Sequence, residues 1–191
     1  MGVLIKSIYA GLMIGLGGTV YLSVENKIVG AVLFSFGLLT IVNQKFYLYT
    51  GKVGYENELS KLFKIAIGNL IGTLIIAILI RFSKQELIEK ATLLWSNKMN
   101  YNARQLIVLP SLCGVMMYLA VDNYSKNNHL LYIILPVVMF ILCGFEHSIA
   151  NMYYMFLSGN INASSVMFVF NCVVWNACGA KCFHLIKKMV E

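Results

Sequence analysis

Residues 130–153 read LLYIILPVVMFILCGFEHSIANMY, and this stretch decides the fold. The segment Leu130–Cys143 is apolar over about half the thickness of a bilayer, because a helical residue rises about 1.5 Å and the hydrocarbon core is about 30 Å thick. Glu146, His147 and Asn151 then follow. Polar groups at membrane depth are costly unless they face a cavity or one another. The stretch therefore predicts a membrane helix that is interrupted midway at a polar site.

A second stretch has the same pattern earlier in the chain. Residues 31–42 (AVLFSFGLLTIV) are apolar, and Asn43, Gln44 and Lys45 follow before the polar Thr50. Two interrupted segments in matching positions are typical of the transport site of proteins built from inverted repeats.

The composition places the whole chain in a membrane. Of its 191 residues, 59% are hydrophobic and only 12% are charged, against about 25% charged in soluble domains. Each span must be helical, since a lipid-exposed strand or loop would leave backbone groups unpaired. We predict an all-α protein with six transmembrane segments, at roughly 3–24, 28–50, 62–82, 104–121, 130–157 and 165–186.

These segments form a single transmembrane domain, residues 1–191, with two halves of three spans. We predict a first repeat at about 3–82, a linker at about 83–103 and a second repeat at about 104–186. An odd number of spans per half makes the second half enter the membrane from the opposite side, which predicts inverted repeats. Within the linker, Gln85 to Leu94 could form a short surface helix.

The net charge of +7 does not indicate a nucleic-acid partner. The basic residues stand at span ends, where they set membrane topology, and their weak bias favours both termini in the cytoplasm. The five cysteines include no C-x-x-C pair, so we expect no metal site. No nucleophile–base pair or phosphate loop appears, so we expect neither an enzyme nor a bound cofactor.

Three polar residues inside apolar spans have two interpretations each. Asn69 and Asn171 would either bond across helices or line a pore. Lys45 would either extend its side chain to the membrane surface or point into a vestibule and attract anions.

Several motifs resemble one known family. The run Gly144-Phe-Glu-His-Ser-Ile-Ala-Asn-Met152 resembles the fifth-helix signature of the formate/nitrite transporter family. Four further stretches resemble its second helix, the loop after it, its third helix and its fourth helix: Leu33-Phe-Ser-Phe-Gly-Leu-Leu39, Leu48-Tyr-Thr-Gly51, Gly68-Asn-Leu-Ile-Gly72 and Leu119-Ala-Val121. The resemblance covers nearly the whole chain. It implies an aquaporin-like fold, a homopentamer with one pore per protomer, and a multi-pass protein of the cell inner membrane.

The resemblance also implies a role for individual residues in passing formate, nitrite or hydrosulfide, or the corresponding weak acid with its proton. His147 matches the central pore histidine, Thr50 the threonine of the loop that interrupts the second helix, and Lys98 a vestibule lysine. Phe34, Leu38 and Phe140 match the apolar residues of the constrictions. Glu146 and Asn171 match polar residues that orient the histidine region, and Asn151 belongs to the signature itself.

The chain departs from the family pattern near the predicted pore. Lys45-Phe46-Tyr47 stands where the family has Gly-Ala-Glu or Gly-Ala-Asp, and Gly114 stands where an asparagine would meet Glu146. Phe170-Asn171 replaces a Gly-Asn pair. Two alternatives to an anion channel therefore stay open, namely a channel for neutral small solutes and a non-conducting membrane scaffold of the same fold.

Overall fold

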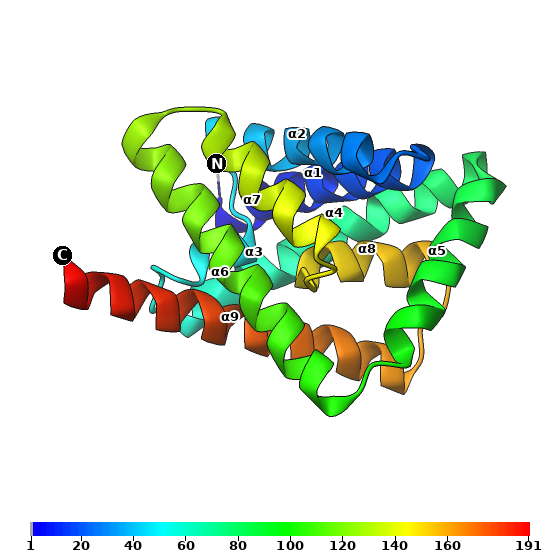
Figure 1. Ribbon diagram of the computed structural model, residues 1–191. Coiled ribbons are helices and arrows are strands. Elements are labelled where there is room, and N and C mark those ends of the chain that lie inside the picture. The colour runs from blue at the N-terminus through cyan, green and yellow to red at the C-terminus, as the bar shows by residue number, and fades with distance from the viewer. Residues whose placement is uncertain (1) are drawn as a thin grey trace.

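A computed structural model describes residues 2–191, and within this range all of the regular secondary structure is α-helical (Figure 1). The helices are α1 (Val3–Ser23), α2 (Lys27–Asn43), α3 (Tyr49–Lys52), α4 (Leu59–Ser83), α5 (Gln85–Met99), α6 (Ala103–Asn127), α7 (Leu131–Leu142), α8 (Ser148–Ser158) and α9 (Ala163–Val190). Four of these, α1, α4, α6 and α9, are long and apolar enough to cross a membrane, and α2 and α7 are shorter apolar helices.

The two predicted interruptions are present and have the same backbone geometry. The turn after α2 has Lys45 in the left-handed region, with φ 55°, and the N–H of Phe46 donates to Ile41 O at 2.9 Å. The turn after α7 has Gly144 at φ 68°, and the N–H of Phe145 donates to Phe140 O at 2.8 Å. A left-handed residue after the last turn is a common helix stop. Both apolar helices therefore end in the same way, before α3 and α8 begin.

Glycines bring two pairs of helices into close backbone contact. A Cβ added to Gly11 of α1 would lie 2.2 Å from Asn69 O of α4, and one added to Gly114 of α6 would lie 2.2 Å from Asn176 O of α9. Without a hydrophobic force between helices in lipid, close packing of this kind holds them together. The α1–α4 and α6–α9 pairs thus use equivalent contacts.

Replacing one of these glycines is expected to separate its helix pair. In Gly114→Leu the new side chain would overlap the α9 backbone, so we expect the yield of folded protein in detergent to fall severely. Gly2→Leu adds the same atoms where a Cβ meets nothing within 4 Å, and it should fold normally. Thermal unfolding and size-exclusion chromatography measure both variants; equal behaviour of the two would contradict this account of the packing.

The predicted linker is mostly the helix α5, which runs to Met99 instead of ending at residue 94. Its Leu87, Ala91 and Trp95 are buried, and the indole N–H of Trp95 donates to Ser165 Oγ of α9 at 3.1 Å. Figure 1 shows α5 standing across one end of the helices, far from the C-terminus. This anchored helix positions Lys98 on its last turn.

Candidate functional site

His147 is the N-cap of α8 and lies buried against α3. Its Nδ1 accepts a hydrogen bond from the backbone N–H of Ala150 at 3.1 Å, and its Nε2 lies 2.8 Å from Thr50 Oγ1. A backbone N–H is always a donor, so Nδ1 carries no hydrogen and the neutral ring has its hydrogen on Nε2. Nε2–H then donates to Thr50, which leaves the Thr50 hydroxyl hydrogen free for another acceptor.

Thr50 is positioned by an asparagine from the neighbouring helix. Asn69 Oδ1 on α4 accepts from the N–H of Tyr49 at 2.8 Å, and its Nδ2 donates to Tyr47 O and Ser7 O, each at 2.8 Å. Asn69 is fully buried. It satisfies backbone groups that the interruption between α2 and α3 leaves without helical partners.

Asn176 does the same at the second interruption. Its Oδ1 accepts from the N–H of Ser148 at 2.9 Å, and its Nδ2 donates to Glu146 O at 2.9 Å and to Pro110 O at 2.7 Å. Sequence reasoning did not single out Asn176. The signal that could have found it is an asparagine followed three residues later by glycine, since Asn69–Gly72 and Asn176–Gly179 share this spacing.

The structure gives this position to Asn176 and not to Asn171, which the resemblance had matched to it. The two differ by five residues, which turns the side chain by about 140° around α9. Asn171 Nδ2 instead donates to Leu106 O at 2.6 Å. Pro110 has no N–H to give to Leu106 O in the α6 helix, so Asn171 satisfies a carbonyl that the proline leaves unpaired.

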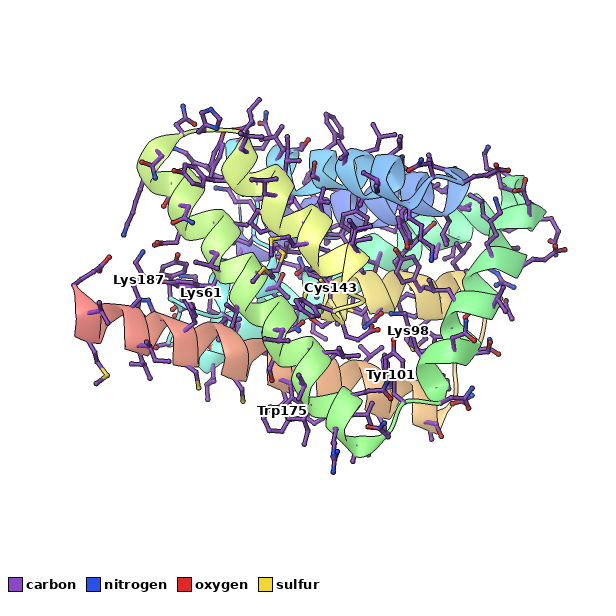
Figure 2. The ribbon with its side chains drawn as sticks, in the orientation of Figure 1. Lys61, Lys98, Tyr101, Cys143, Trp175 and Lys187 are labelled. Atoms are coloured by element: carbon purple, nitrogen blue, oxygen red, sulfur yellow. The ribbon has the colours of Figure 1, made fainter. Side chains whose placement is uncertain are left out.

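Glu146 is held by three side chains in a buried cluster. Lys98 Nζ lies 2.5 Å from Glu146 Oε2, the hydroxyl of Tyr101 donates to Oε1 at 3.0 Å, and Asn151 Nδ2 donates to Oε2 at 2.8 Å. Only 1% of Glu146 is exposed. Figure 2 shows Lys98 and Tyr101 side by side where α5 passes into α6. With Gly114 lacking a side chain, these three residues supply the partners of the carboxylate.

Apolar side chains surround His147. The rings of Phe34 and Phe140 meet edge to face with centroids 6.0 Å apart, and the Phe140 ring stacks on His147 at 5.7 Å. Leu38, one turn beyond Phe34 on α2, is 1% exposed. Phe34 and Phe140 thus form an apolar frame on the Lys98 side of the ring, and Leu38 continues it in the wall of the second cavity, described next.

Two cavities meet this group of residues from different sides. The Lys98 cavity, of about 180 Å³, is lined by Lys98, Glu146, Phe34, Phe140 and His147 among others. The Lys45 cavity, of about 420 Å³, is lined by Lys45, Lys52, Leu38, Leu48 and Tyr124 among others. His147 is in the wall of the Lys98 cavity, and its partner Thr50 lies in the chain between Leu48 and Gly51 of the Lys45 cavity wall. The His147–Thr50 pair therefore lies between the two cavities.

The polar groups of the site are mainly hydrogen-bond donors. In the described range 2–191, no group of three or more His, Cys, Asp or Glu side chains could hold a metal ion. Of the residues predicted for the site, all except Asn171 lie in the Glu146 cluster, in the His147–Thr50 pair or in the apolar frame around it. The site thus offers a solute the Nε2–H of His147, the hydroxyl of Thr50 and the ammonium group of Lys98, which is bound to Glu146.

Two solved structures with a similar fold are described as channels. One, described as a pentameric formate channel with formate bound, matches with a TM-score of 0.86 and 22% identity, over 98% of this chain and 95% of that chain. Another, described as an FNT family ion channel, matches with a TM-score of 0.75 and 20% identity, over 98% and 87%. At these identities the likeness shows the fold.

Curated relatives of the sequence are formate channels. The formate channel FocB of Escherichia coli (strain K12) is 26% identical over 185 residues, covering 80% of this chain and 65% of that protein. The formate channel FocA of the same strain is 27% identical over 150 residues, covering 66% and 52%. The chain thus spans about half to two thirds of the length of these relatives.

A sequence profile described as formate/nitrite transporter matches residues 1–181. It covers both interruptions, the buried histidine and the two asparagines that fix them. The chain therefore belongs to the formate/nitrite transporter family.

Proposed function

We propose that the chain is a membrane channel for small monovalent anions or their weak acids, with formate as the first candidate and nitrite and hydrosulfide as the others. The observation that carries this proposal is the His147–Thr50 pair, 2.8 Å apart. His147 lines the Lys98 cavity, together with Phe34 and Phe140, and Thr50 lies between Leu48 and Gly51, which line the Lys45 cavity together with Leu38. This apolar frame admits only a small solute, and the pair gives that solute hydrogen bonds where water is excluded.

The proposed architecture has six spans in two inverted repeats, with both termini in the cytoplasm and the protein in the cell inner membrane. The broken segments α2–α3 and α7–α8 would each count as one span. The equivalent hydrogen bonds of Asn69 and Asn176, and the equivalent glycine contacts of Gly11 and Gly114, support two repeats.

Desolvation decides the chemical form that crosses. A bare anion in an apolar slit is opposed by up to tens of kcal/mol. Protonating a carboxylate whose pKa is near 4 costs about 1.4 kcal/mol per pH unit, or about 4 kcal/mol at neutral pH. We therefore propose that the solute passes Phe34, Leu38 and Phe140 as a neutral acid, with Nε2–H of His147 and the Thr50 hydroxyl as its hydrogen-bonding partners.

A channel for neutral small solutes remains the second candidate because of one observation. The ammonium of Lys98 is bound to Glu146 at 2.5 Å, so the charges of this pair cancel at the wall of the Lys98 cavity. A wall without net charge favours neutral solutes as much as anions.

Uptake into proteoliposomes tests the proposal. Vesicles containing the purified chain should take up formate, nitrite or hydrosulfide faster than empty vesicles, and an inward proton gradient should increase uptake if the neutral acid crosses. Uptake of glycerol or urea without any anion would favour the neutral-solute channel, and uptake of none of these solutes would overturn the channel proposal.

We propose a homopentamer with one pathway in each protomer, in keeping with the pentameric formate channel that the fold resembles. The expected native mass spectrum in detergent shows five copies of the 21.4 kDa chain. Stable monomers or tetramers under conditions that preserve the fold would contradict the assembly.

A further inference from the structure

A single hydrogen bond joins two walls of the Lys45 cavity. The hydroxyl of Tyr124 on α6 donates to Asn43 Oδ1, on the last residue of α2, at 2.5 Å, and both residues line the cavity. Among residues 2–191 no other hydrogen bond connects α2 to α6. We call this contact the α2–α6 seam, and it lies where the walls formed by the two helices meet.

Each of these helices is fixed to a different neighbour. A Cβ added to Gly37 of α2 would lie 2.6 Å from Met13 O of α1, and Gly114 brings α6 equally close to α9. Contacts of this kind hold membrane helices together along their backbones. A seam with one neutral hydrogen bond has far less to break, and regions with few contacts open locally at low free energy. The α2–α6 seam is therefore held more weakly than the helix pairs on either side of it.

The seam stands between the exposed and the buried part of the cavity lining. Ser125 and Asn128 of the lining are exposed to solvent. Leu38 and Leu48 of the same lining are each only 1% exposed. Tyr124 is intermediate between these groups, at 8% exposure. A solute that moves from the exposed lining to the buried lining therefore passes the Tyr124 side chain.

The other half of the chain has a tyrosine at the matching position but lacks the acceptor. Tyr21 stands on α1 where Tyr124 stands on α6, ten residues after the glycine of the close helix contact, and it lines the Lys98 cavity. The position that matches Asn43, two residues before the left-handed residue of the turn, is Leu142. A leucine side chain accepts no hydrogen bond. Of the two matching positions, only Asn43 can therefore close a seam.

We propose that the α2–α6 seam is a gate of the Lys45 cavity, and that Tyr124 and Asn43 limit the size of the solute that passes it. With the hydrogen bond formed, the tyrosine ring is held in the cavity wall; with the bond broken, the ring can turn aside and the two walls can separate. Both groups are uncharged, so the gate sorts solutes by size and not by charge. Its effect on passage rests on the proposed channel function, whereas the opening of the seam does not.

A thiol reporter measures the opening of the seam without any transport. Val121 is half-buried in the cavity lining, about one helical turn before Tyr124, and Val121→Cys places a thiol there. In a background with Cys143, Cys178 and Cys182 replaced by serine, we would compare the rates at which neutral methanethiosulfonates with a methyl or a benzyl group modify this thiol. Tyr124→Phe removes only the hydroxyl and should raise the benzyl-to-methyl rate ratio about twofold to tenfold, the range for one neutral hydrogen bond.

Asn43→Leu removes the acceptor and should raise the rate ratio by a similar factor. The double variant should do no more than either single variant, because the two residues share one bond. Tyr118→Phe is the matched control, since Tyr118 is on the same helix, lines neither cavity, and has its hydroxyl 3.0 Å from His184 Nδ1. It loses a hydrogen bond of the same kind and should leave the rate ratio unchanged.

Flux provides the second measurement. In proteoliposomes, with the rates of empty vesicles subtracted, Tyr124→Phe should raise propionate uptake relative to formate uptake about twofold to tenfold. An unchanged thiol rate ratio in both Tyr124→Phe and Asn43→Leu would overturn the gate. An unchanged flux ratio, or exclusion of propionate from every variant, would overturn its role in size selection. If the thiol rate ratio responds and no solute crosses the wild-type protein, the channel proposal fails and the gate stands.

Discussion

His147→Phe is expected to lower flux by about twofold to tenfold while the protein still assembles. The substitution removes the Nε2–H that contacts Thr50, and a hydrogen bond to a neutral group, such as the neutral acid proposed to cross, contributes about 0.5–1.5 kcal/mol. At about 1.36 kcal/mol per factor of ten, this loss gives the stated range.

The design must separate the ring from its role as a helix cap. His147 caps α8 by accepting from Ala150 N–H, and His147→Phe removes the cap as well. His147→Asn keeps a favoured N-cap residue but has no group that reaches Thr50 as Nε2 does. His129→Phe, at an exposed position, is the control. Unchanged flux in both position-147 variants would refute the role of the ring.

Asn176→Leu is expected to destabilise the protein severely. It leaves Ser148 N–H, Glu146 O and Pro110 O without their side-chain partner, and each buried unsatisfied group costs about 1–3 kcal/mol. The sum, about 3–9 kcal/mol, approaches the whole stability of a typical domain, which is about 5–15 kcal/mol. Little folded protein should be recovered.

Asn171→Leu is the matched comparison on the same helix. It frees one carbonyl, Leu106 O, and should cost about a third as much as Asn176→Leu. Asn69→Leu should resemble Asn176→Leu, because Asn69 makes the equivalent three hydrogen bonds. Thermal unfolding in detergent ranks the three variants; equal losses for Asn171→Leu and Asn176→Leu would contradict the assignment of the two asparagines.

The interrupted helices were predictable because each interruption depends on consecutive residues. An apolar run that changes to Asn43-Gln44-Lys45, or to the residues from Gly144 to His147, indicates both that a helix ends and that it ends partway through the membrane. The motif around His147 likewise predicted a buried, polar environment, and the structure has His147 at 2% exposure.

The partners of the site residues were harder to predict because they depend on helix register. Asn171 and Asn176 are the same residue type in the same apolar helix, and only the rotation of α9 against α6 distinguishes them. The Lys98–Glu146 pair joins positions 48 residues apart, and the pairing needs α5 to extend one turn beyond its predicted end. Sequence patterns along one element carry no information on such distances between elements.

The asparagine contacts also set an order for biogenesis. Every hydrogen-bond partner of Asn69 and of Asn176 at the interruptions precedes that asparagine in the chain. During synthesis, Ser148 emerges 28 residues before Asn176, which is about 1 to 6 s at ribosomal speeds of about 5–20 residues per second. For that interval the α7–α8 turn lacks its final partner, so we expect it to wait in the insertion machinery until α9 arrives, while the α1–α4 unit is already complete.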